Sequence, residues 1–125
     1  MKIDHLVILA SDLAKSAAFY DTVLAAAGFT KTRDHVWLDE GGVAVDLRPA
    51  ASHGAYDRYG AGLNHFGIAA PDADTVRAIA RQLAEQGIGV PDIQIIDGAT
   101  CLFLPDPDGL RVEISHEPPG GLTAD

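Results

Sequence analysis

Four polar residues occupy matching positions in two similar stretches of the chain and have the chemistry of metal ligands. His5 and His65 each come fourth in a short apolar segment and lie 60 residues apart. Asp46 and Glu113 each follow a glycine by four positions in two later segments. Imidazole and carboxylate groups together suit Fe, Mn, Co, Ni or Zn, and an incomplete ligand set leaves room for water or substrate. The pattern predicts a divalent-metal site.

The local sequence predicts that these four residues lie on the strand faces opposite the apolar ones, and these faces would line a cleft if the sheets curl. In a strand, residues i and i+2 point to the same face, so Glu113 lies opposite Val112 and Ile114. Each histidine taken singly is better explained as a structural or surface residue, and each acid as a solvated strand residue, because one face of an antiparallel sheet often contacts water. The matched occurrence of histidine with histidine and acid with acid favours the metal site.

The two halves of the chain carry the same order of predicted elements, βαβββ. Alternating apolar residues predict strands, and apolar residues at helical spacing predict one helix in each half. Ser11 is the expected N-cap of the first helix and Asp72 or Asp74 that of the second, with Gly28 and Gly87 as the stops. The first half has its strands at 2–9, 29–33, 35–40 and 42–48 and its helix at 11–28, and the second half has strands at 62–69, 92–96, 100–104 and 109–115 and a helix at 71–87.

The length of 125 residues suits one compact domain. We expect a first module over about 1–50, a linker over about 51–61, a second module over about 62–117 and a flexible tail over about 118–125. The expected fold class is α+β, because the two amphipathic helices must cover the apolar faces of the sheets.

Composition disfavours some classes of partner. The formal net charge of -9 disfavours nucleic acid and anionic membrane surfaces. A single cysteine, Cys101, rules out a disulfide within the chain and fits a reducing compartment. The apolar run at the N-terminus is interrupted by Asp4 and His5, which argues against a signal peptide or a membrane span. We therefore expect a cytoplasmic protein.

Three stretches resemble the vicinal oxygen chelate superfamily, which includes glyoxalase I, bleomycin and fosfomycin resistance proteins, methylmalonyl-CoA epimerase and extradiol dioxygenases. They are IDHLVILASDLAKSAAFYDTVLAAAGF, GLNHFGIAAPDADTVRAIARQLAEQG and FLPDPDGLRVEI. The resemblance implies two βαβββ modules that form a curved, U-shaped mixed sheet around a metal cleft, with helices on the outer face. It places His5, His65 and Glu113 on the family's ligand positions. Asp46 falls on the fourth, where Glu or Gln is usual, and its shorter side chain departs from the pattern.

The resemblance also implies a homodimer for a small two-module member. The site would then combine His5 and Asp46 of one chain with His65 and Glu113 of the other, or form in a module-swapped arrangement. A two-fold dimer contains two such sites.

The first functional hypothesis is a metal-dependent enzyme of lyase, isomerase/epimerase or thiol-transferase type. The metal would act as a Lewis acid on vicinal oxygens of a small substrate. Asp46 or Glu113 would move a proton when not bound to the metal. Arg48 and Arg111 share the faces of these acids and are candidates for holding an anionic substrate group, although pairing with local acids or solvent is the stronger explanation for both.

The second hypothesis is a metal-free small-molecule or drug-binding protein similar to bleomycin resistance proteins. Trp37, Tyr56 and Tyr59 would then stack on a flat ligand. Against this, Trp37 sits in a strand with core character, and the two tyrosines are expected to pack the linker down. The remaining histidines, His35, His53 and His116, have no counterpart in the other half and are interpreted as surface or linker residues. Of these, His53 and His116 could line the cleft mouth.

Overall fold

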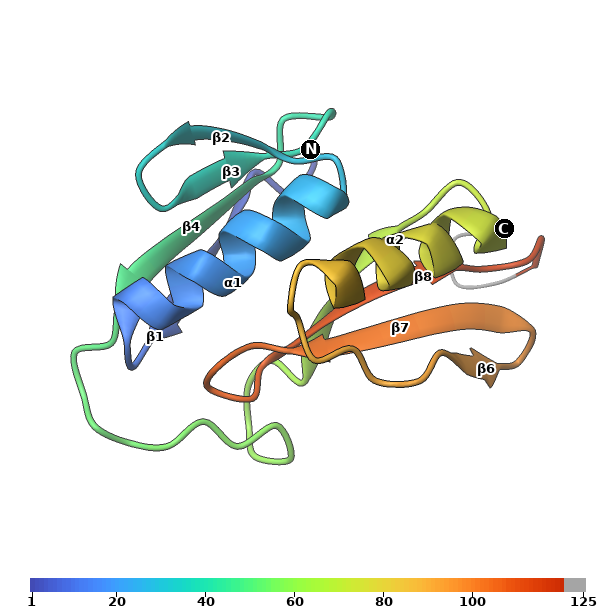
Figure 1. Cartoon of the computed structure of the whole chain (residues 1–125). Helices are drawn as coiled ribbons and strands as arrows, with labels where there is room; N and C mark the ends of the chain where they lie inside the picture. The colour runs from blue at the N-terminus through green and yellow to red at the C-terminus, as the bar shows by residue number, and fades with distance from the viewer. Residues whose placement is uncertain (121–125) are drawn as a thin grey trace. The chain divides into compact units, whose positions relative to one another are not determined.

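The structure, a computed structural model, describes residues 1–120, and each half of it has the order βαβββ (Figure 1). The first half contains β1 (His5–Ala10), α1 (Leu13–Ala26), β2 (Thr30–Arg33), β3 (Val36–Leu38) and β4 (Ala44–Pro49). The second half contains β5 (His65–Ala69), α2 (Ala73–Glu85), β6 (Gln94–Ile96), β7 (Ala99–Pro105) and β8 (Arg111–His116). The predicted α+β class and the repeated order are confirmed.

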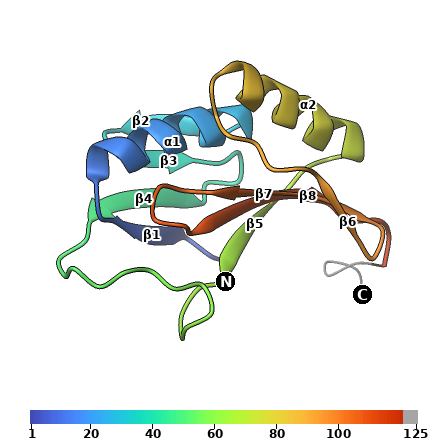
Figure 2. The same cartoon turned by 60° about the horizontal axis from the view of Figure 1, so that its bottom comes forward.

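Each half forms its own four-stranded mixed sheet. The strand order is β1-β4-β3-β2 in the first sheet and β5-β8-β7-β6 in the second. In both sheets the first strand of the half runs parallel to the last, and the other neighbours are antiparallel. One helix packs on one face of each sheet, α1 against β2 and β4 and α2 against β7 and β8 (Figure 2). The other face of each sheet is called its open face below.

The two parallel strand pairs share one register. In the first sheet Val7 lies opposite Asp46, two positions beyond His5. In the second sheet Gly67 lies opposite Glu113, two positions beyond His65. Because residues opposite each other in a pair point to the same face, each histidine and its acid are diagonal neighbours on the open face.

Both helices begin at an aspartate and end before a glycine. Asp12 caps α1 by accepting from the Lys15 backbone N–H at 3.1 Å, so the expected cap at Ser11 is wrong by one position. Asp72 caps α2 in the same way through Thr75 N at 2.7 Å, as one of the two predicted alternatives. After the helices, Gly28 and the equivalent Gly87 have φ values of 88° and 87°, which glycine adopts without a steric cost.

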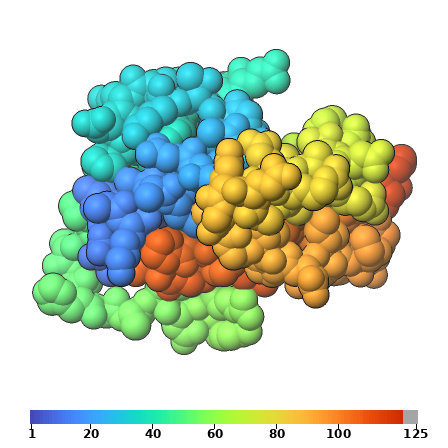
Figure 3. All heavy atoms as spheres, in the orientation of Figure 1, coloured from blue at the N-terminus to red at the C-terminus, as the bar shows by residue number. Residues whose placement is uncertain are grey.

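The hydrophobic cores lie between each helix and its sheet. Tyr20, Val23 and Leu24 of α1 are fully buried, and Val45 and Leu47 of β4 are at most 2% exposed. The corresponding buried residues of the second half come from α2, β7 and β8: Val76, Ile79, Leu83, Leu102, Leu104, Val112 and Ile114. Figure 3 shows the opposite, solvent-facing side of α2, in yellow, at the molecular surface.

The chain divides into two compact units whose boundary falls within the expected linker. The first unit is Met1–Tyr56 together with Asp106–Asp108, and the second is Asp57–Pro105 together with the chain from Gly109 onward. Three residues of the β7–β8 loop therefore belong to the first unit. Of the tail expected over about 118–125, residues 121–125 lie outside the described residues.

In the first unit, the loop residues Asp106 and Asp108 bind α1 and Ser11, which precedes the helix cap. The Tyr20 hydroxyl donates a buried 2.7 Å hydrogen bond to Asp106 Oδ2. Ser11 donates to the Asp108 carboxylate from its backbone N–H, at 3.0 Å, and from its hydroxyl. Ser11 is therefore held by a residue 97 positions away in the sequence rather than acting as a helix cap.

Candidate functional site

The second sheet brings one predicted histidine and one predicted acid together. His65 Nε2 lies 3.2 Å from Glu113 Oε1. The Glu113 side chain is only 15% exposed and that of His65 is 36% exposed. The contact follows from the parallel register, which makes the two residues diagonal neighbours on β5 and β8. Across from Glu113, Gly67 has no side chain, and the carboxylate occupies the space beside it.

A cavity of about 580 Å³ opens beside this pair in the second unit. Such a volume falls within the usual range for small-molecule sites. Its lining includes the carboxyl groups of Glu113, Asp97 and Glu117 and the imidazole of His65. The rest of the lining consists of small or apolar residues: Ile96, Ala99, Cys101, Phe103, Pro118, Pro119 and Gly120. The pair therefore stands at the wall of a largely apolar cavity whose acids outnumber its single imidazole.

Cys101, the single cysteine of the chain, is 5% exposed and also lines this cavity. Burial raises the pKa of its thiol, and the nearby carboxylates Glu113 and Glu117 raise it further. The thiol is therefore neutral at neutral pH, which makes it a poor nucleophile.

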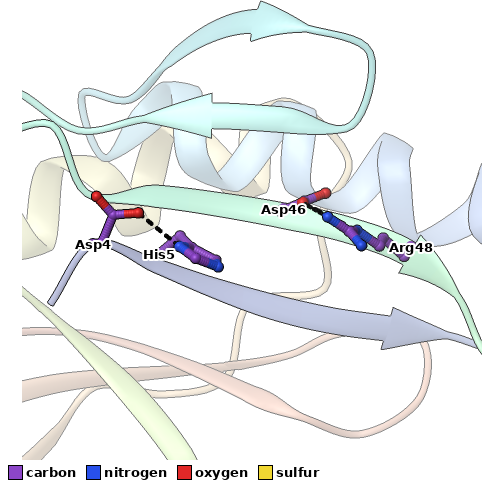
Figure 4. Close-up of polar contacts among 4 residues, drawn as sticks. All are labelled: Asp4, His5, Asp46 and Arg48. Atoms are coloured by element: carbon purple, nitrogen blue, oxygen red, sulfur yellow. Dashed lines mark hydrogen bonds and ion pairs between the residues drawn. The ribbon is translucent and has the colours of Figure 1, made fainter.

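In the first sheet, the predicted histidine and acid each bind another residue (Figure 4). His5 Nδ1 lies 2.7 Å from Asp4 Oδ2. Asp46 Oδ2 accepts from Arg48 Nη2 at 2.6 Å and from Nε at 3.1 Å. The hydrogen bond from Arg48 lowers the pKa of the Asp46 carboxyl and raises that of the guanidinium. Asp46 is therefore an anion already satisfied by a neighbour.

The donor set fits half of a metal centre. Among residues 1–120, no three side chains of His, Cys, Asp or Glu are placed to hold one ion together. His65 Nε2 and Glu113 Oε1 nevertheless lie close enough together for one cation to bind both. His5 has the same diagonal placement toward Asp46, but Arg48 engages that carboxylate. The predicted four-ligand set stays a prediction.

The two arginines predicted to bind substrate make contacts within the protein. Arg48 is the ion-pair partner of Asp46, as one of the two alternatives foresaw. Arg111 places its guanidinium carbon 4.5 Å from the centre of the Phe103 ring and donates to Asn64 Oδ1 at 3.2 Å. Their role toward a substrate stays a prediction.

Asn64 is a polar residue of the site that the sequence reasoning missed. Its Oδ1 lies 2.6 Å from His65 Nδ1. One signal was present in the sequence, because Asn64 precedes His65 just as Asp4 precedes His5, 60 positions earlier. Phe103 was also missed, and it packs its ring edge-on against His65 with centroids 5.6 Å apart.

The aromatic residues of the alternative hypothesis occupy three different environments. Trp37 is 1% exposed and donates to Asp21, so it is a core residue as expected. Tyr56 lines a cavity of about 610 Å³ in the first unit, together with His53. Tyr59 is 80% exposed, so the expectation that it packs the linker down is wrong.

Of the two unmatched histidines considered for a cleft mouth, His116 lies near the pair described above. It lines a further cavity of about 500 Å³ that also includes His65 and Glu113. Its Nδ1 lies 3.3 Å from the Ala70 carbonyl oxygen.

Within residues 1–120 there is no helix with the length and apolar character needed to cross a membrane.

Comparisons with known proteins identify the fold family. A search of curated proteins finds no match. A candidate glyoxalase from Bacillus halodurans shares 22% identity, with 92% of this chain and 95% of that one aligned and a TM-score of 0.75. A glyoxylase/bleomycin resistance protein/dioxygenase domain from Frankia sp. EAN1pec shares 18% identity over 96% and 94%, with a TM-score of 0.75. The oxidase ChaP-H1 shares 20% identity over 97% and 99%, with a TM-score of 0.66.

These solved structures show a shared fold, and the sequence itself provides the family. Residues 2–114 match the profile of the Glyoxalase/Bleomycin resistance protein/Dioxygenase superfamily. The match contains both βαβββ repeats up to Ile114, including all four predicted ligands. The chain belongs to the Glyoxalase/Bleomycin resistance protein/Dioxygenase superfamily.

Proposed function

We propose that the chain is a divalent-metal-dependent enzyme that acts on a small molecule through two neighbouring oxygens, with lyase, isomerase/epimerase or thiol-transferase chemistry. The observation that carries the proposal is the approach of His65 Nε2 to Glu113 Oε1, 3.2 Å apart at the wall of a cavity. An imidazole nitrogen and a carboxylate oxygen this close together are half of the ligand set expected for a divalent ion of borderline softness, such as Zn.

His65 and Glu113 would hold the metal together with His5, and Asp46 is the candidate for the fourth position. A bound metal ion would supply Lewis acidity toward the substrate oxygens. Arg48 keeps Asp46 ionised and lowers its pKa, so this carboxylate is a weak base in the paired state. Glu113 is therefore the better candidate for proton transfer. It lies in the cavity wall, and its described ion-pair partner is His65 rather than an arginine.

The lining of the cavity beside His65 favours an uncharged or cationic substrate with an apolar body. Asp97, Glu113 and Glu117 provide its acidic groups, and no lysine or arginine among residues 1–120 lines it. An anionic group would therefore meet like charge there, whereas Phe103 and Ile96 offer apolar contact. A homodimer that completes the site with His5 of a second chain, and a cytoplasmic location, stay predictions.

The test is metal titration by calorimetry, with elemental analysis of protein prepared in the presence of Zn, Ni, Co, Mn and Fe salts. Wild-type protein is expected to bind a divalent ion, and His65→Ala and Glu113→Gln are expected to lose that binding. His116→Ala is the matched control, because His116 lines a neighbouring cavity but lacks an equivalent in the first half. Binding that survives His65→Ala unchanged, or a wild-type protein that takes up no ion, would overturn the proposal.

The second candidate function is metal-free binding of a small apolar ligand. The observation in its favour is the apolar part of the cavity lining, with Phe103 and two prolines. On this alternative, an environment-sensitive apolar dye would bind the metal-free protein, and added divalent metal would leave its affinity unchanged. Dye binding that responds to added divalent metal would favour the enzyme instead.

A further inference from the structure

The residue before each histidine makes the same contact in both halves of the chain. Asp4 Oδ2 lies 2.7 Å from His5 Nδ1, and Asn64 Oδ1 lies 2.6 Å from His65 Nδ1. Asp4 and Asn64 are separated by 60 positions, as the histidines are. The two units thus place a side-chain oxygen against the same ring nitrogen by the same local arrangement (Figure 4 shows the first).

The orientation of the Asn64 amide is fixed by two other partners. Its Oδ1 accepts a hydrogen bond from Arg111 Nη2 at 3.2 Å, and its Nδ2 donates to the Arg58 carbonyl oxygen at 2.9 Å. A guanidinium only donates and a carbonyl only accepts, so oxygen and nitrogen of the amide cannot be exchanged without losing both bonds. The atom that faces His65 Nδ1 is therefore an acceptor, and Nδ1 carries the hydrogen.

This assignment determines whether the opposite ring nitrogen, Nε2, carries a hydrogen or a lone pair. A neutral imidazole has one N–H, so with the hydrogen on Nδ1 the lone pair is on Nε2. His65 Nε2 lies 3.2 Å from Glu113 Oε1, which is also an acceptor when ionised. Two acceptors at this separation are stabilised by a cation between them, either a proton or a metal ion. A histidine that ligates a metal commonly donates its other N–H to an oxygen in this way.

We propose that Asn64 and Asp4 are positioning residues that hold His65 and His5 in the Nδ1–H tautomer and so present Nε2 of both rings for metal binding. The purpose assigned to the tautomer rests on the proposed metal-dependent function. The tautomer itself rests only on the hydrogen bonds of the metal-free chain.

The two positioning residues differ in how firmly they act. Asn64 is held at both ends of its amide, and its partner Arg111 is itself packed over the Phe103 ring. The Asp4 side chain is 86% exposed, so water competes for His5 Nδ1. Removing the Asn64 oxygen should therefore change the tautomer of its histidine more than removing the Asp4 carboxylate does.

The test is nitrogen NMR of metal-free protein with labelled imidazole rings, recorded at rising pH until the ring-nitrogen signals no longer change, so that the neutral form of each ring is observed. Wild-type His65 is expected to be predominantly Nδ1–H, and Asn64→Ala is expected to give a mixture with Nε2–H. Asn64→Asp keeps an oxygen beside Nδ1 and should retain the wild-type tautomer. His116, whose Nδ1 faces the Ala70 carbonyl, is the internal control and should not change.

Three results would overturn the inference: a predominantly Nε2–H form of His65 in the wild type, an unchanged tautomer in Asn64→Ala, or an Nε2–H form in Asn64→Asp. Asn64 is exposed, so the variants are expected to fold, and amide spectra confirm it. If Asn64→Ala fails to fold, Asn64→Asp and Asp4→Ala decide the question by the same readout.

Metal affinity separates this inference from the proposed function. Asn64→Ala is expected to weaken divalent-metal binding roughly 10- to 100-fold, as loss of such outer-shell partners typically does, and Asn64→Asp is expected to preserve it. A wild-type protein that binds no metal would overturn the proposed function while the NMR result on the tautomer still stands. A wild type that binds metal with an affinity indifferent to Asn64→Ala would overturn the role of Asn64 and leave the metal function intact.

Discussion

Gly67 lies directly opposite Glu113 in the β5–β8 pair, where a Cβ built on the glycine would sit 3.8 Å from Glu113 Oε2. The equivalent position of the first sheet is Val7, directly opposite Asp46. The longer acid therefore faces the residue without a side chain, and the shorter acid faces a β-branched one. The two sheets have the same register but divide the space on their open faces differently.

Gly67→Val is expected to separate metal binding from stability. A β-carbon alone is accommodated at ordinary contact distance, but the γ-methyl groups would compete with Glu113 for the space beside His65. We expect metal affinity to fall on the order of 10-fold, the lower end of losses seen when a ligand is displaced from its support. The free energy of unfolding should not fall, because valine suits a strand better than glycine.

Calorimetric metal titration and urea denaturation of the same variant check both expectations. Gly67→Ala is the matched control and should bind metal like the wild type. Wild-type affinity in Gly67→Val would show that the glycine is unrelated to the position of Glu113.

Tyr20→Phe is expected to destabilise the first unit and to alter its response to alkali. Burial raises the pKa of the Tyr20 hydroxyl above its usual range, and the Asp106 carboxylate raises it further. A raised folded-state pKa gives stability that is full below the unfolded value of ~10 and is lost as the pH rises above it. Removing the hydroxyl deprives the buried Asp106 of a charge-assisted hydrogen bond, at a cost of about 1.5–3 kcal/mol.

Urea denaturation at neutral pH and through the alkaline range measures both effects. The variant should be less stable at neutral pH and should lose less stability than the wild type as the pH rises above ~10. Tyr59→Phe, at an 80% exposed position, is the control and should match the wild type. An alkaline slope in Tyr20→Phe equal to that of the wild type would contradict the assignment.

Arg48→Gln is expected to raise the pKa of Asp46 toward the ordinary aspartate value of ~3.9. The hydrogen bond from Arg48 is the largest cause of the lowered value, and the charge of Arg33 contributes less. Because the folded-state pKa is depressed, the pair stabilises the protein above the unfolded value and loses that contribution as the pH falls through the folded one. Wild type and variant should therefore converge in stability in strong acid.

Carbon NMR titration of the Asp46 carboxyl gives the measurement. Arg33→Gln is the control, since it removes a charge near Asp46 without removing the hydrogen bond, and it should shift the titration less. A larger shift in Arg33→Gln than in Arg48→Gln would reverse the stated order of causes.

Cys101 is expected to react slowly despite lining a cavity. Its thiol is buried, and the raised pKa keeps the thiolate fraction small at neutral pH. Reaction with a disulfide reagent such as Ellman's should be at least roughly tenfold slower in the native protein than in urea-unfolded protein. Equal rates would mean that the thiol is open to solvent and ordinary in acidity.

The elements of the fold could be predicted because their signals are local. Strand alternation and a glycine after each helix are visible within a few residues, and all the expected strands and helices are present. The wrong N-cap shows the limit of local signals. Ser11 and Asp12 are both good capping residues, and the choice between them depends on Asp108, far along the chain.

The candidate site could be predicted in composition but not in pairing. Sequence periodicity places Asp46 and Arg48 on one face, yet only the folded distances show that they bind each other. The contact between His65 and Glu113 likewise depends on the register of β5 against β8, which no local pattern specifies. Asn64 could have been predicted from its repeat counterpart Asp4, but its hydrogen bond to a ring nitrogen depends on side-chain geometry.

The membership of Asp106–Asp108 in the first unit limits how independent the two repeats are. Although the halves share one plan, the acceptor for the buried Tyr20 hydroxyl is encoded in the other half. A copy of the first repeat alone would retain Tyr20 and lose its acceptor Asp106, so one repeat cannot simply replace the other. Recombination within the linker would therefore separate Tyr20 from Asp106, two residues that the core of the first unit requires together.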